Sequence, residues 1–124
     1  MGCSLHADHI VGALPHLEHH GVAFVVVSRA PLAEIEAFKK RMGWTFEWVS
    51  SYGGEFNYGY HVSFTKEEIA KGKAYHNYKI QEIEIEEMSG LSVFYKNVAG
   101  DVFHTYSTYG RGSEELVSAT CAWI

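Results

Sequence analysis

The sequence has few cysteines, few prolines and no long apolar run. Its 124 residues include two cysteines and two prolines. The longest apolar run, Val22–Val27, is far shorter than the roughly 20 residues that span a bilayer. No apolar signal-peptide core is visible near the start, where histidine and aspartate occur instead. We therefore expect a cytoplasmic protein that does not contact a membrane.

Clusters of lysine and arginine are also lacking. The formal net charge is -5, from 10 basic and 15 acidic residues. Nucleic-acid binding requires a concentrated positive surface, so we expect no nucleic acid as a partner. Cys3 and Cys121 lie at opposite ends of the chain, and in a reducing cytosol both are expected to be free thiols. A disulfide between them would require the two termini to meet.

The first third of the chain alternates helical and extended patterns. Apolar residues at helical spacing from Leu5 to Leu17 predict a helix that Ser4 caps and Gly21 ends. Pro15 is expected to kink or interrupt this helix, because proline lacks the backbone N–H. The β-branched run Val22–Ser28 then predicts a strand of a parallel sheet.

A second helix and a second strand follow. Pro31 suits a first helical turn, and Gly43 suits the residue after the last turn. The apolar stripe of this helix consists of Leu32, Ile35, Phe38 and Met42. Phe46–Val49 predicts a short strand, and Ser50–Tyr60, rich in glycine and aromatic residues, predicts an irregular functional loop.

The remaining pattern is that of an insertion, a hairpin and a last helix. Thr65 begins a capping box, and residues 66–87 are interpreted as an insertion without clear periodicity. Leu91–Tyr95 and Val102–Tyr109 predict an antiparallel hairpin, and Ser113 is expected to cap a C-terminal helix. We interpret the order as one domain over residues 1–124, with a mixed sheet, and as a thioredoxin-like α/β fold that lacks its first strand.

Several segments, taken in this order, resemble one family, the thioredoxin-like domain-of-unknown-function family eight hundred and ninety-nine. Its members are often described as predicted dithiol-disulfide oxidoreductases. The matching segments are Cys3-Ser4, Ala7-Asp8, Val27–Leu32, Arg41–Trp44, Trp48–Ser51, Phe56–Tyr58, Leu91–Tyr95 and Phe103–Tyr109. The resemblance implies a thioredoxin fold with a Cys-x-x-Cys site, in which Cys3 corresponds to the second cysteine. The first cysteine and the strand before it would precede residue 1, and residues 119–124 depart from the family pattern.

Cys3 is the candidate catalytic residue. Thiol–disulfide exchange requires a thiolate, and a helix N-terminus can lower a cysteine pKa to roughly 3.5–7.5. His6, one turn further, would add positive charge when protonated. Without a resolving cysteine, exchange within one chain stops at the mixed disulfide. The alternative is that Cys3 is only a small residue close to a chain end.

Polar and aromatic side chains form the candidate substrate site. Arg29 follows the first strand at its carboxyl end, where open α/β sheets bind ligands, and its guanidinium suits a carboxylate or phosphate. The resemblance implies that these residues surround the thiol, and the set is Arg29, Trp44, Trp48, Phe56 and Asn57. The alternative places the two tryptophans in the core and pairs Arg29 with an acidic neighbour.

Histidines near the N-terminus raise the question of a metal. The pairs have i,i+3 or i,i+4 spacing, and the residues are His6, His9, His16, His19 and His20. Imidazoles with Cys3 or Asp8 match ligands of Zn²⁺. No second ligand cluster completes four-coordination, so we expect no metal and no cofactor. Likewise, no Gly-x-Ser-x-Gly elbow surrounds Ser28 or Ser107.

These patterns lead to two main functional hypotheses, and a metal-binding module built on the N-terminal histidines is a third. The first is a thiol-disulfide oxidoreductase that acts on protein or small-molecule thiols and disulfides. The second is a redox-inactive homodimer that serves as a binding or structural module. A homodimer is expected because loss of the first strand would leave unpaired backbone groups and apolar surface, which a second copy of the chain would cover.

Overall fold

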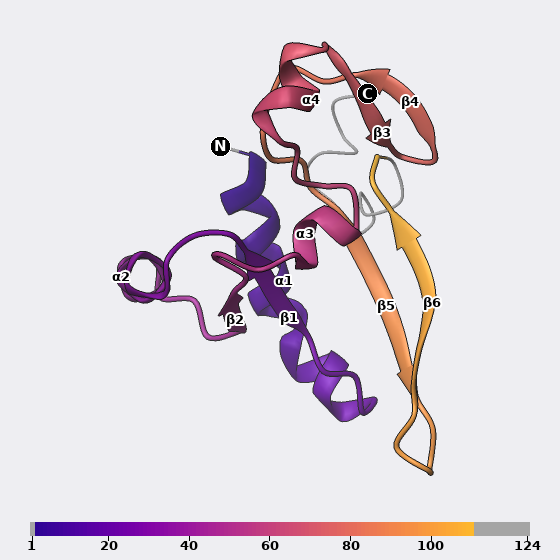
Figure 1. Ribbon diagram of the computed structural model, residues 1–124. Helices are drawn as coiled ribbons and strands as arrows, with labels where there is room; N and C mark the ends of the chain where they lie inside the picture. The colour runs from indigo at the N-terminus through magenta and orange to yellow at the C-terminus, as the bar shows by residue number, and fades with distance from the viewer. Residues whose placement is uncertain (1, 111–124) are drawn as a thin grey trace, which may run out of the picture. The chain divides into compact units, whose positions relative to one another are not determined.

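The computed structural model describes residues 2–110, with the backbone alone for residues 2 and 3. In chain order the elements are α1 (Gly2–His19), β1 (Val25–Ser28), α2 (Leu32–Met42), β2 (Glu47–Ser50), α3 (Phe56–Gly59), α4 (Lys66–Ala70), β3 (Lys73–His76), β4 (Lys79–Glu82), β5 (Leu91–Lys96) and β6 (Val102–Thr108) (Figure 1). They belong to two compact units, residues 2–57 and residues 58–110, and each is described by itself. The helix expected after Ser113 lies outside the described residues, as does Cys121.

Helix α1 begins earlier than the sequence indicates and ends where the sequence predicts. It starts at Gly2, so Ser4 lies inside the first turn and is not the N-cap residue. The predicted interruption at Pro15 is wrong, because the helix continues through this residue at the cost of one backbone hydrogen bond. The predicted end is confirmed: Gly21 has a φ of 70°, and its N–H donates to the Glu18 carbonyl oxygen at 2.9 Å.

The first unit contains the parallel strand pair that the sequence predicts. Strand β1 pairs with β2, and Val26 lies opposite Trp48. Helix α2 connects the two strands and ends at Met42, and Gly43 follows it with a φ of 70°, which is favourable for glycine. Ile35 of this helix is 1% exposed and belongs to the core. Strand β1 is shorter than predicted, because residues 22–24 do not pair.

The second unit begins with the capping box and a hairpin that the sequence did not reveal. Thr65 accepts from the Glu68 backbone N–H at 3.2 Å, and the Glu68 carboxylate accepts from the Thr65 N–H at 2.8 Å. Strands β3 and β4 lie inside the region interpreted as an insertion and pair antiparallel. Asn77 and Tyr78 form their two-residue loop with φ values of 52° and 63°, as a type I′ turn requires.

The last predicted hairpin is confirmed. Strands β5 and β6 pair antiparallel, with a register shift after Val93. Their connection is held by Asn97, whose side-chain oxygen accepts from the Asp101 N–H at 2.9 Å and whose amide donates to the Asp101 carboxylate at 3.0 Å. This hairpin contributes strands of six and seven residues, the longest strands among the described residues.

A mixed α/β architecture is therefore confirmed, whereas the expected single mixed sheet is not seen. The strands of residues 2–110 form three separate two-stranded sheets, β1–β2, β3–β4 and β5–β6. Each strand pairs with a strand of its own unit. No backbone hydrogen-bond ladder joins the parallel pair to the antiparallel hairpins among the described residues.

His76 is the most buried polar side chain of the second unit. It is 1% exposed. In strand β3 it lies on the same buried face as Ala74, which packs with Phe64. Its Nδ1 is 2.8 Å from the His61 carbonyl oxygen, and because a carbonyl only accepts, Nδ1 carries the proton. The rings of Phe64 and Tyr109 contact it edge to face, at 5.9 and 5.6 Å. His76 of β3 thus fills part of the core of the second unit.

Replacing His76 by alanine should destabilise the protein by about 2–4 kcal/mol, because a cavity opens and the His61 carbonyl loses its donor. Chemical denaturation followed by circular dichroism measures this difference. The matched control is Ile80→Ala in the same hairpin, where the side chain is 74% exposed and the expected change is below about 0.5 kcal/mol. Equal effects of the two substitutions would contradict a core role for His76.

Candidate functional site

Cys3 lies in the first turn of α1. The helix starts at Gly2 and extends for 18 residues. The backbone N–H groups of a first turn have no partners inside the helix, and together with the helix dipole they favour a negative charge there. The first turn of α1 carries no acidic residue that would oppose such a charge. This backbone position therefore suits a thiolate.

A hydrogen bond fixes the N-terminal half of α1. The indole Nε1–H of Trp44 donates to Oδ1 of Asp8 at 2.7 Å, across 36 residues of sequence. Trp44 is 9% exposed. Asp8 follows Cys3 by five residues, which is about 7.5 Å along a helix axis. Trp44 is thus bonded within one and a half turns of the candidate catalytic residue.

Trp44 belongs to an aromatic cluster in the first unit. Its ring centroid lies 5.3 Å from that of Phe46, 5.4 Å from that of Phe38 and 5.9 Å from that of Trp48. The guanidinium carbon of Arg41 lies 4.5 Å from the centroid of the Phe38 ring. The cluster consists of residues of α2, of β2 and of the segment between them, and it includes both Trp44 and Trp48.

The carboxyl ends of β1 and β2 are joined by serines. Trp48 Nε1–H donates to Ser28 Oγ at 2.9 Å, and the Ser51 N–H donates to the Ser28 carbonyl at 2.8 Å. Ser50 Oγ–H donates to the Ala30 carbonyl at 2.6 Å. These bonds hold the chain on both sides of Arg29, which is half-buried and directly follows β1. Arg29 therefore occupies the edge where open α/β sheets bind ligands.

Asn57 is hydrogen-bonded at the same edge of the parallel strand pair. Ser51 Oγ–H donates to Asn57 Oδ1 at 2.6 Å, and Asn57 is 8% exposed. Phe56 precedes it in the short helix α3 and is 48% exposed. Trp48 is thus hydrogen-bonded to Ser28, and Asn57 to Ser51. Trp44 is hydrogen-bonded to α1 instead.

Four residues of this arrangement are not among the predicted site residues: Asp8, Ser28, Ser50 and Ser51. The sequence indicates Asp8 as a possible metal ligand, Ser28 as the last residue of a strand, and Ser50 and Ser51 as part of a loop. Asp8 receives its role from a contact 36 residues away, for which one sequence contains no signal. Ser50 and Ser51 follow the predicted strand Phe46–Val49 directly, and this pair of serines was the sequence pattern that could have indicated their role.

The N-terminal histidines do not form a metal site in the part of the chain that the structure describes. His9 Nδ1 lies 2.8 Å from the Leu5 carbonyl oxygen, within the helix itself. His19 and His20 contact each other edge to face at 5.4 Å. No group of three histidine, cysteine or carboxylate side chains that would hold a metal ion occurs among the described residues.

A serine–histidine contact in the second unit does not make a nucleophile. His104 Nε2 lies 2.7 Å from Ser107 Oγ, and Ser107 Oγ lies 2.6 Å from Ser92 Oγ. The same Nε2 is 2.9 Å from the Tyr106 carbonyl oxygen, which can only accept. Nε2 therefore carries its proton and cannot take one from Ser107. We interpret this chain of contacts as a support for the β5–β6 hairpin.

A comparison with protein families identifies the family of the chain. The model of a family described as bacterial protein of unknown function (DUF899) matches residues 1–123. The searches of curated proteins and of solved structures each return no match. None of the helices in residues 2–110 combines the length and the apolar character that a membrane crossing needs.

The Asp8–Trp44 bond should contribute about 1.5–3 kcal/mol to stability, because its acceptor is a carboxylate. A double-mutant cycle of Asp8→Ala and Trp44→Phe measures the coupling energy. The matched cycle of Ser28→Ala and Trp48→Phe removes a bond between neutral groups and should give about 0.5–1.5 kcal/mol. A coupling energy of zero for Asp8 and Trp44 would show that the bond does not anchor α1.

Proposed function

The chain belongs to the DUF899 family of bacterial proteins, and from this premise we propose that it takes part in thiol–disulfide exchange through Cys3. The observation that carries the proposal is the place of Cys3 in the first turn of an 18-residue helix. The N–H groups of that turn stabilise a thiolate, and only a thiolate attacks a disulfide.

The reaction is a displacement at sulfur. The Cys3 thiolate attacks one sulfur of an external disulfide, a new S–S bond forms, and the other sulfur leaves as a thiolate with the electron pair of the broken bond. A second external thiolate then attacks the mixed disulfide and releases Cys3. The substrates are protein or small-molecule thiols and disulfides, and an outside thiol resolves the intermediate.

The substrate-binding residues of the proposal are those at the edge of the parallel strand pair and in the aromatic cluster. Arg29 binds a substrate carboxylate, since guanidinium groups pair with carboxylates in a bidentate manner. The half-buried Trp48 and the exposed Phe56 offer rings to the apolar part of the substrate. Trp44 positions α1 through Asp8, and Asn57 holds the loop through Ser51.

Cys3 should form a mixed disulfide with an aromatic disulfide reagent at least about threefold faster than Cys121 at pH 7, because more of it is thiolate. Stopped-flow absorbance gives the rates, and mass spectrometry of peptides assigns them. Ser4→Glu should slow Cys3, since a carboxylate in the first turn raises the pKa of the Cys3 thiol. The matched control Glu18→Gln, at the other end of α1, should leave the rate unchanged. Equal rates for both cysteines would reject the proposal.

A second candidate is a redox-inactive homodimer that acts as a binding or structural module. It is favoured by the β5–β6 hairpin, which is a two-stranded sheet within residues 58–110. A sheet of two strands is marginally stable alone. Six large apolar or aromatic side chains of its two strands are 46% to 63% exposed, and they are Val93, Phe94, Tyr95, Val102, Phe103 and Tyr106. A second copy of the chain would cover this surface.

In this second candidate, sedimentation equilibrium should give a dimeric mass at micromolar concentration. Phe103→Ser together with Tyr106→Ser should shift the equilibrium toward the monomer, because apolar area at the interface is lost. Cys3→Ser should leave the mass unchanged. A monomeric mass for the unaltered chain at every concentration would reject the homodimer.

A further inference from the structure

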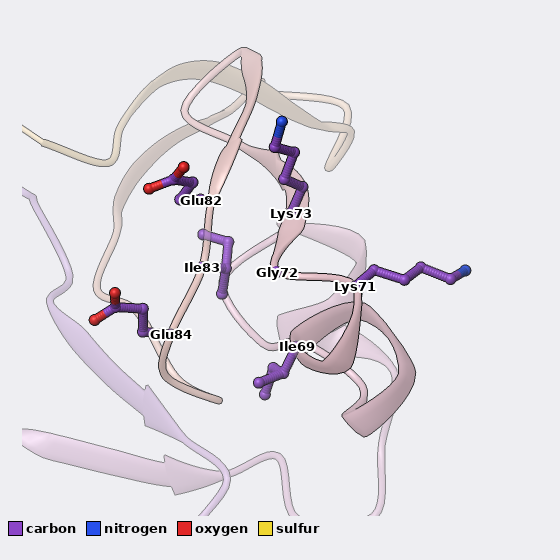
Figure 2. A pocket seen from close by; sticks show the side chains of 7 residues that line it. All are labelled: Ile69, Lys71, Gly72, Lys73, Glu82, Ile83 and Glu84. Atoms are coloured by element: carbon purple, nitrogen blue, oxygen red, sulfur yellow. The ribbon is translucent and has the colours of Figure 1, made fainter.

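We draw no further inference here: the strongest candidate, the exposed apolar face of the β5–β6 hairpin, belongs to the homodimer surface already described, and in the depression between α4 and the β3–β4 hairpin the charged side chains point away from the isoleucines (Figure 2).

Discussion

The hydrogen bond from Trp44 to Asp8 is the constraint on which the candidate thiol site depends. It joins α1 to the aromatic cluster of α2 and β2, and it does so at 2.7 Å with a charged acceptor. Asp8 lies one and a half turns from Cys3, so the bond fixes the part of the helix whose N–H groups would hold a thiolate. The same cluster includes Trp48, whose bond to Ser28 fixes the chain before Arg29.

Elements with strong local signals are those that the sequence predicts well. The second helix has glycine after its last turn and an apolar stripe, and both of its neighbouring strands follow from β-branched or aromatic runs. The capping box at Thr65 and the β5–β6 hairpin are confirmed for the same reason. Each of these features lies within a few residues of the chain.

Features that depend on context were missed. The β3–β4 turn uses Asn77 and Tyr78 at positive φ, where the usual signal is asparagine followed by glycine, so residues 66–87 were not recognised as a hairpin. Pro15 is accepted inside α1 because the rest of the helix keeps its bonds. In the site, Arg29 was predicted from its place directly after the first strand and Asn57 from the resemblance. Asp8 acquires its role from a distant partner that no local pattern indicates.

The central claim is that the helix N-terminus keeps Cys3 as a thiolate, and the pH dependence of its alkylation tests this most directly. Mass spectrometry would follow the alkylation rates of Cys3 and Cys121 in the same sample, with Cys121 as the internal reference. The account predicts a midpoint for Cys3 well below the ordinary cysteine pKa of about 8.5. A midpoint at or above that value would contradict it and leave the homodimeric module as the better explanation.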